Sequence, residues 1–253
     1  MRIDINSDTG ESFGAYTIGH DAGLFRSITS ANVAAGFHAG DPSVLRDTIR
    51  LAKEHGVAVG AHPGFPDLVG FGRRDLNVTP TEAEDLVLYQ VAAVAGVAAA
   101  EGVKIQHVKP HGALFNMAVR NRELADAIAR AVAAFDTALI LFGLPGSEIL
   151  NAGRAAGLRV AAEVFADRAY EADGLLASRR KPGAVIHDPA AVVARAVRMV
   201  KEHTVVAIDG SVVALDADTI CVHGDTPGSD DLAAKIHAGF EAAGVTVRAI
   251  GSD

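Results

Sequence analysis

Residues Val57–Pro66, with the sequence VAVGAHPGFP, combine the two features that decide the fold of this chain. The first five residues form an apolar run of strand length, which is typical of a parallel strand covered on both faces. A histidine, His62, and a loop rich in glycine and proline follow at once. The segment therefore predicts a buried strand, Val57–Ala61, that delivers a polar side chain at its C-terminal end.

The same pattern of an apolar run before a polar cluster or turn recurs along the chain. Further predicted strands cover Arg2–Ile5, Ser27–Ala34, Ile105–Lys109, Ala138–Phe142, Val160–Phe165 and Thr219–Val222. Helix patterns alternate with the strands and cover Pro42–His55, Thr79–Glu101, Glu123–Ala134, Ser147–Ala156, Pro189–His203 and Asp230–Ala243. Repeated strand–helix alternation predicts an α/β fold with a parallel sheet.

The positions of the polar clusters distinguish an open sheet from a closed barrel. In an open sheet the ligand groups gather near one switch point, whereas in a barrel every strand ends at the same mouth. Polar clusters follow six predicted strands, which favours a parallel (β/α) barrel. Residues Val205–Leu215, with Asp209-Gly210 between apolar runs, predict an added β-hairpin. We identify no linker or internal repeat and expect a single domain over residues 1–253.

The composition indicates which classes of partner and which cellular compartment to expect. Of the 253 residues, 49% are hydrophobic and 21% are charged, which excludes disorder caused by high charge. The formal net charge of −8 argues against nucleic acid or an anionic membrane as a main partner, because both require clustered lysine and arginine. The lone Cys221 cannot form an internal disulfide. The N-terminal residues lack a secretory signal pattern, and the apolar stretch Val87–Ala100 is too short to span a bilayer. We therefore expect a cytoplasmic protein.

The loops after the first two predicted strands carry carboxylates, amides and a histidine. Asp8 and Glu11 follow Asn6 at the first strand end, where a carboxylate could act as a general base, bind a metal or only close a turn. Asn32 lies inside an apolar strand, where a buried amide needs hydrogen-bond partners. His38 lies among small residues in a glycine-rich loop, which indicates a functional position.

Basic side chains follow the next two predicted strands. The loop after His62 carries Arg73 and Arg74, which could bind a carboxylate or a phosphate or could be ordinary solvated arginines. Strand alternation places His107, Lys109 and His111 on one face. A lysine that points into a barrel mouth needs an anionic partner, unless it reaches solvent at the rim.

The last two clusters combine acids with a histidine and an arginine. Glu163 lies within a predicted strand and Asp167 just after it, so both need partners, and Arg168 is the nearest candidate. A structural ion pair would explain the same residues. His223 and Asp225 follow the last strand, where Asp225 could also cap a helix.

As a set, these clusters indicate an enzyme. Histidines follow four different predicted strands, and the acids would meet them at one mouth. The chain contains no Walker A loop, no GxGxxG after a strand and no GxSxG elbow. The residues alone predict a hydrolytic or C–N-acting barrel enzyme that uses carboxylate and imidazole acid–base chemistry.

The same segments resemble the LamB/YcsF family in order and over nearly the whole chain. The segments that carry the resemblance are Asn6–Gly14, Ser30–Pro42, Gly60–Pro66, Gly70–Arg74, Lys109–Asn116, Glu163–Tyr170 and Val222–Thr226. The resemblance implies a distorted parallel barrel of the glycoside hydrolase/deacetylase type. It also implies a subunit of an ATP-dependent 5-oxoprolinase, which opens the lactam of 5-oxo-L-proline to L-glutamate together with B and C subunits.

With the resemblance added, the predicted site divides into two groups of residues. The predicted catalytic residues are Asp8, His38, His62, Lys109, His111, Glu163, Asp167 and His223. The predicted substrate contacts are Asn6, Glu11, Asn32, Arg73, Arg74, Arg168 and Asp225. The expected substrate is a small carboxylate, and the expected co-substrate is ATP accompanied by Mg²⁺. The chain could also form a homo-oligomer. The residues leave open whether a further metal binds.

The chain departs from the family pattern at several positions. Ser7 and Ala35 stand where the family often has cysteine, and Thr9 and Phe115 replace commoner residues. A thiol mechanism at residues 7 or 35 is therefore excluded, and the chemistry rests on carboxylates, histidines and lysine.

Two other functions remain open from the sequence. A stand-alone metal-dependent deacetylase could hold a divalent ion with Asp8, His38 and His62, although Asn6 stands where a second carboxylate would help. A non-catalytic subunit could use the same mouth to capture a small carboxylate or sugar for partner enzymes.

Overall fold

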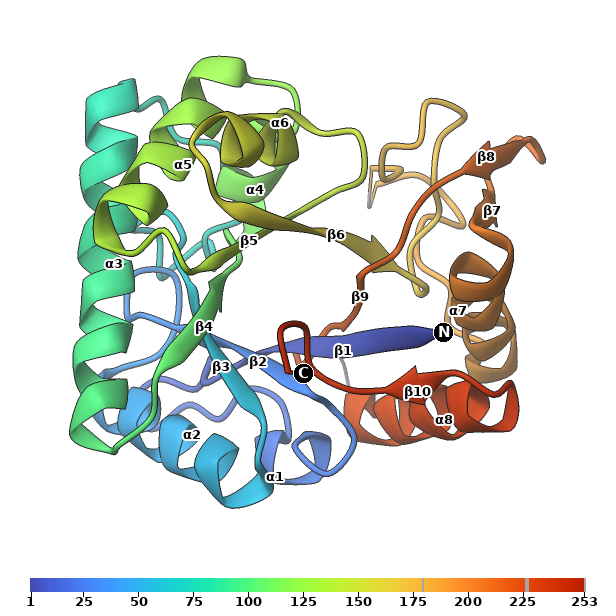
Figure 1. Cartoon of the computed structure of the whole chain (residues 1–253), viewed down its shortest axis with the longest axis horizontal. Coiled ribbons are helices and arrows are strands. Elements are labelled where there is room, and N and C mark those ends of the chain that lie inside the picture. The colour runs from blue at the N-terminus through green and yellow to red at the C-terminus, as the bar shows by residue number, and fades with distance from the viewer. Residues whose placement is uncertain (179, 226–227, 253) are drawn as a thin grey trace.

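A barrel of parallel strands forms the centre of the computed structural model, which describes residues 1–178, 180–225 and 228–252. Within these ranges, seven strands close the barrel, since β1 pairs with β2 on one side and with β9 on the other (Figure 1). The strands are β1 (Arg2–Thr9), β2 (Ser30–Ala34), β3 (Ala58–His62), β4 (Ile105–Val108), β5 (Ile140–Gly143), β6 (Arg159–Phe165) and β9 (Thr219–Val222). The predicted barrel is confirmed.

Helices surround the barrel as an outer layer (Figure 1). They are α1 (Asp21–Leu24), α2 (Pro42–His55), α3 (Pro80–Ala100), α4 (Gly112–Ala118), α5 (Arg122–Phe135), α6 (Glu148–Ala155), α7 (Pro189–Glu202) and α8 (Ser229–Ala242). Two of the predicted helices, Pro42–His55 and Thr79–Glu101, begin at side-chain caps. Asp41 accepts hydrogen bonds from the backbone of Ser43 and Val44 at the start of α2, and Thr79 and Glu82 form a capping box on α3.

The sequence pattern misplaced some element bounds. The predicted strand Arg2–Ile5 continues to Thr9, because the polar residues from Asn6 onward pair in register with β2 and β9. The helices α1 and α4 and the short strand β10 (Thr246–Val247) were not predicted. β10 pairs with the beginning of β1, at the end of the barrel opposite the mouth.

The predicted hairpin is present beside the barrel. The strands β7 (Thr204–Val206) and β8 (Val212–Ala214) pair antiparallel and belong to a sheet of their own. In Figure 1 they lie next to α7, away from the barrel strands.

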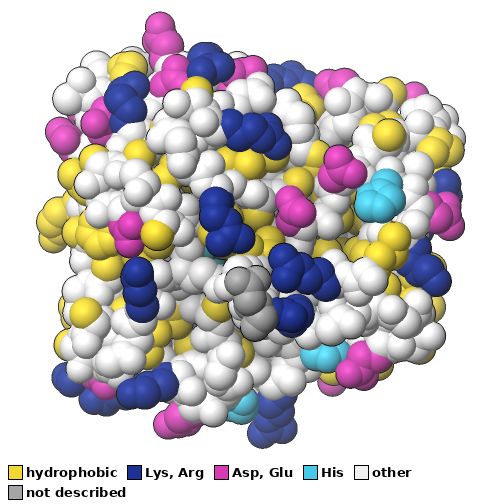
Figure 2. Space-filling view, in the orientation of Figure 1, with side chains coloured by type: hydrophobic (Ala, Val, Ile, Leu, Met, Phe, Trp, Pro, Cys, Tyr) yellow, Lys and Arg dark blue, Asp and Glu magenta, His cyan; other side chains and the backbone are white. Residues whose placement is uncertain are grey.

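The longest helix, α3, is longer than the apolar stretch that the sequence indicated. Its 21 residues are long and apolar enough to cross a membrane by length and composition, so the expectation that this segment is too short is wrong. Val87, Val91 and Val94 are fully buried, whereas Tyr89 is exposed. Hydrophobic side chains reach the surface along the side where α3 lies, among interspersed acidic and basic groups (Figure 2). The buried valines make α3 part of the helical layer of the barrel.

The interior of the barrel contains polar side chains. Asp4 is completely buried and accepts hydrogen bonds from the hydroxyls of Thr29, Ser30 and Thr219. Neighbouring polar side chains inside the barrel form hydrogen bonds with one another. The strands can therefore carry polar groups toward the mouth without leaving them unpaired. Apolar side chains fill the space between the strands and the helices.

Candidate active site

A cavity of about 490 Å³ opens at the C-terminal ends of the barrel strands. Seven of the predicted site residues line it: Asp8, His62, Arg73, Lys109, His111, Arg168 and His223. They come from the ends of β1, β3, β4, β6 and β9 and from the loops that follow. A cavity of this size can hold a small polar substrate.

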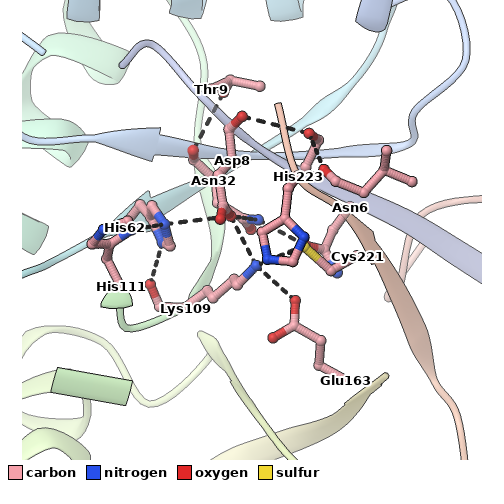
Figure 3. A network of polar contacts seen from close by, with 12 residues as sticks. Asn6, Asp8, Thr9, Asn32, His62, Lys109, His111, Glu163, Cys221 and His223 are labelled. Atoms are coloured by element: carbon pink, nitrogen blue, oxygen red, sulfur yellow. Dashed lines mark hydrogen bonds and ion pairs between the residues drawn. The ribbon is translucent and has the colours of Figure 1, made fainter. Parts of the chain in front are cut away.

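Lys109 is the central charge of the cavity, although its side chain is only 4% exposed. Its Nζ lies 2.8 Å from Asp8 Oδ1 and 2.8 Å from Glu163 Oε1 (Figure 3). The same nitrogen lies 3.1 Å from the Sγ of Cys221 and 3.3 Å from the Oδ1 of Asn6. One cation therefore holds two carboxylates that come from β1 and β6, the two strands that flank β9.

The electrostatics of this network favour the ionised forms of Lys109 and Asp8. Burial disfavours the ammonium form of Lys109, but Asp8 and Glu163 outweigh it and raise the lysine pKa well above its usual value. Burial also disfavours ionisation of Asp8, but His62 and Lys109 hold its pKa well below the usual range. The cavity thus contains a permanently charged lysine beside an ionised aspartate.

Three histidines and one glutamate form a second cluster, in which His62 and His111 line the cavity and His38 and Glu11 lie behind them. His62 donates from Nδ1 to the carbonyl of Lys109 at 2.7 Å, and its Nε2 lies 2.9 Å from Nδ1 of His111. The His38 ring stacks on that of His111, with 3.8 Å between ring centroids. Glu11 Oε1 lies 3.7 Å from Nε2 of His38. All four side chains are buried.

Burial favours the uncharged forms of His38, His111 and Glu11 in this cluster. Burial, together with the other two histidines, lowers the pKa of His38 well below its usual value. Burial and His62 lower the pKa of His111 to about 3. Burial and the nearby Asp8 raise the pKa of Glu11 well above its usual value. The backbone of Phe71 has a positive φ of 55°, and its carbonyl accepts a hydrogen bond from Nε2 of His111.

A histidine–aspartate pair lies on another wall of the cavity. Nδ1 of His223 lies 3.0 Å from the Oδ2 of Asp167, and the ring stacks on Phe165. An aspartate that fixes one imidazole nitrogen orients the ring for proton transfer. Arg73 forms an ion pair with Asp225 at 2.5 Å near the mouth.

Two buried amides and a histidine support the network from below. Nδ2 of Asn32 donates to Asp8 Oδ1 at 2.9 Å and to the Oδ1 of Asn6 at 2.7 Å. His107 stacks on Phe142 and directs Nε2 to Asn32. These predicted substrate contacts, Asn6 and Asn32, therefore orient Asp8 from beneath and do not line the cavity.

Other expectations from the sequence need correction. The guanidinium of Arg74 pairs with Asp67, and Arg74 does not line the cavity. Arg168 does line it, but the partner of Glu163 is Lys109 and not the neighbouring arginine. The predicted alternation also fails to explain His111, because β4 ends at Val108 and His111 is the N-cap residue of α4.

Several residues of the site were not predicted from the sequence. Cys221, which was considered only for disulfides, contacts Lys109 inside the barrel. Burial raises the pKa of this thiol well above its usual value, so the cysteine is an un-ionised neighbour of the lysine. Phe115 and Phe165 give the cavity an apolar wall. The alternation of Cys221 with His223, which was predicted to face the mouth, could have indicated an inward position.

Two glycines make room for the imidazole rings. A methyl group at Gly60 would overlap the ring of His107, and one at Gly64 would lie 2.6 Å from Nδ1 of His38. Neither glycine has a positive φ, so the backbone itself would accept alanine at both positions. The side chains of the site, and not the turn, require glycine there.

Comparison with known proteins agrees with this geometry. The profile of the LamB/YcsF family matches residues 3–252. The chain is 55% identical over 248 residues to the 5-oxoprolinase A subunit of Bacillus licheniformis, covering 98% of each chain. It is 56% identical over 248 residues to that of Chloroflexus aggregans, again covering 98% of each. The crystal structure of the lactam utilization protein from Thermus thermophilus matches with a TM-score of 0.95 and 51% identity, over 99% of this chain and 100% of that chain.

A more distant likeness concerns the fold alone. The catalytic domain of a peptidoglycan N-acetylglucosamine deacetylase from Eubacterium rectale matches with a TM-score of 0.53 and 14% identity, over 99% of this chain and 88% of that chain. This agrees with the predicted barrel of the deacetylase type. The full-length profile match and the two relatives above half identity decide the family: the chain belongs to the LamB/YcsF family.

Proposed function

We propose that this chain is the A subunit of a 5-oxoprolinase and that it handles the lactam, 5-oxo-L-proline, in the cavity. Relatives that carry the name of the 5-oxoprolinase A subunit share more than half of their residues with it over nearly the full length. The observation that carries the proposal is Lys109, a buried cation that faces the cavity between two carboxylates. Lactam opening requires such a charge at the carbonyl oxygen.

Four cavity residues have a place in this reaction. A lactam is a stable amide, so its carbonyl must be polarised before water can attack. Lys109 stabilises the negative charge that develops on the lactam oxygen, and the ionised Asp8 positions the attacking water. His223, held by Asp167, delivers a proton to the departing amine. Arg73 is the fixed positive charge for the substrate carboxylate.

ATP, accompanied by Mg²⁺, is the proposed co-substrate. Transfer of its γ-phosphoryl group to the lactam oxygen would convert that oxygen into a good leaving group. A first water then adds to that carbon, the C–N bond breaks as the nitrogen takes up a proton, and γ-glutamyl phosphate results. A second water attacks this acyl phosphate, so that phosphate departs and L-glutamate remains. We propose that this occurs in the cytoplasm in a complex with B and C subunits.

The test is glutamate release from 5-oxo-L-proline by the purified chain with ATP and Mg²⁺, with and without the B and C subunits of the same source. We expect turnover in the complex, and loss of that turnover with Lys109→Ala and with His62→Ala at unchanged circular dichroism. The matched control is Lys104→Ala, because Lys104 is exposed at the surface.

Two outcomes would overturn the proposal. Absence of turnover by a folded, associated complex would favour a deacetylase or a subunit that only binds substrate. Near wild-type rates in both cavity variants would show that the chemistry occurs elsewhere.

A further inference from the structure

The facing nitrogens of His62 and His111 cannot both be satisfied while the two rings are neutral. Nδ1 of His62 faces the carbonyl of Lys109, and Nε2 of His111 faces the carbonyl of Phe71, at 2.7 and 2.8 Å. A carbonyl oxygen only accepts, so each ring must place its proton on that nitrogen. In the neutral rings the two remaining nitrogens then direct lone pairs at each other across 2.9 Å.

Either a proton or a metal cation between the two rings would remove this repulsion. A proton on Nε2 of His62 would also satisfy Asp8, whose Oδ1 lies 3.3 Å away. It would leave Oε1 of Glu11 and both ring nitrogens of His38 without a hydrogen-bond partner, and both side chains are at most 4% exposed. Buried polar atoms without partners are rare in proteins. A cation that all four side chains share would give a partner to Oε1 of Glu11, to one ring nitrogen of His38 and to the two facing nitrogens of His62 and His111.

We propose that Glu11, His38, His62 and His111 bind a divalent transition-metal ion of the Zn²⁺ type. One potential ligand atom from each side chain lies within 4.8 Å of all the others, and three imidazoles with one carboxylate suit zinc. The hydrogen bonds from His62 and His111 to backbone carbonyls are those that metal-binding histidines usually make with their second nitrogen.

His38 must turn to complete the site. Its ring is stacked on that of His111 with an angle of 6° between the planes, so their lone pairs do not converge on one point. No hydrogen bond holds the His38 ring in this orientation within the described part of the chain. Rotation about its side-chain bonds therefore costs no hydrogen bond, and it directs one nitrogen at the space that the other three ligands enclose.

Four protein ligands close a tetrahedral site, which makes the metal structural. Glu11 follows β1, His38 follows β2, His62 ends β3 and His111 follows β4. The ion would therefore tie four neighbouring strand ends together at the wall of the cavity. This inference does not depend on the proposed lactam reaction, because metal binding is measured without substrate.

The experiment uses the full chain after chelator treatment, with Zn²⁺ alone as the probe. Competition with a chromophoric chelator gives the affinity, and elemental analysis gives the stoichiometry. We expect about one Zn²⁺ per chain and affinity losses of about 100-fold or more in Glu11→Gln and His38→Gln, since even indirect partners of a metal site contribute about 10- to 100-fold. The matched controls are Glu54→Gln and His187→Gln, which lie on the surface and should bind like the wild type.

Co²⁺ provides a second readout of the same site. A four-coordinate site gives Co²⁺ an intense visible spectrum, and His38→Gln should abolish it while circular dichroism is unchanged. The proposal is overturned if the wild type binds Zn²⁺ no more tightly than either site variant. It is also overturned if Co²⁺ shows no four-coordinate spectrum in the wild type, in which case a shared proton occupies the space between His62 and His111.

Discussion

Replacing Lys109 with methionine tests the ion-pair network of the cavity. Methionine preserves most of the side-chain volume but removes the cation that lies 2.8 Å from both Asp8 and Glu163. Two carboxylates would then remain buried without their shared counterion. Breaking a buried pair by removal of one partner costs about 3–5 kcal/mol, a large part of the roughly 5–15 kcal/mol that stabilises a typical domain.

The cost should depend on pH in a direction that the structure fixes. In the wild type the pKa of Asp8 is lowered, so its stabilising contribution persists until the pH falls below the ordinary range of aspartate. In Lys109→Met the orphaned carboxylates take up protons more readily when folded than when unfolded. The variant should therefore recover stability as the pH falls from 8 to 5, by at most about 1.4 kcal/mol per pH unit for each proton bound.

Urea unfolding followed by circular dichroism at pH 8 and pH 5 measures both effects. The control is Lys104→Met, which removes an exposed lysine 3.8 Å from Asp136 and should cost less than about 1 kcal/mol. Adding Glu163→Gln to Lys109→Met should restore part of the loss, because one of the two orphaned charges disappears. A loss below about 1 kcal/mol at pH 8, or an equal loss at both pH values, would refute the assignment of Lys109 as the counterion.

Other consequences concern substrate binding, thiol reactivity and acid stability. Arg73→Ala should raise KM for 5-oxo-L-proline about 10- to 100-fold, as expected for loss of a charged hydrogen bond. Arg74→Ala should leave KM within about twofold, because Arg74 pairs with Asp67 away from the cavity. Equal changes in KM in steady-state assays would contradict the placement of the two arginines. Cys221 should resist alkylation until the protein unfolds, because its thiol is buried with a raised pKa; modification of the folded protein, seen by mass spectrometry, would disprove this. The pKa of Glu11 is raised, so the wild-type folded state loses stability as the pH rises above the ordinary pKa of glutamate. Metal-free Glu11→Gln should therefore gain stability relative to the wild type from pH 5 to pH 8, whereas Glu54→Gln should not. Parallel pH profiles of wild type and Glu11→Gln in thermal unfolding would exclude this.

The fold could be predicted from the sequence because its elements have local signals. The apolar run before His62 and the caps Asp41 and Thr79 identify a strand and two helix starts without knowledge of the rest of the chain. The end of β1 had no such signal, since Asn6 and Asp8 resemble loop residues. They are strand residues because the polar interior of the barrel provides them with partners, and that interior exists only after the barrel has closed.

The candidate site was predictable as a set of residues but not as an arrangement. The placement of polar residues after strands identified Asp8, Lys109 and His62, and the structure brings these side chains together at one cavity. The sequence could not show that Glu11 lies behind the wall with His38, since their contact depends on how two separate loops fold over each other. Nor could it distinguish Arg73 from Arg74, because the difference lies in which one Asp67 binds.

The glycines beside the imidazoles have a consequence for comparing relatives of this protein. A substitution at residue 64 leaves every histidine in the sequence, yet a single methyl group there would displace the ring of His38. The same holds for residue 60 and the ring of His107. A relative with alanine at either position must therefore have rearranged its histidines, even if an alignment shows all of them retained. These two glycines distinguish relatives that keep the geometry of the site from relatives that keep only its residue types.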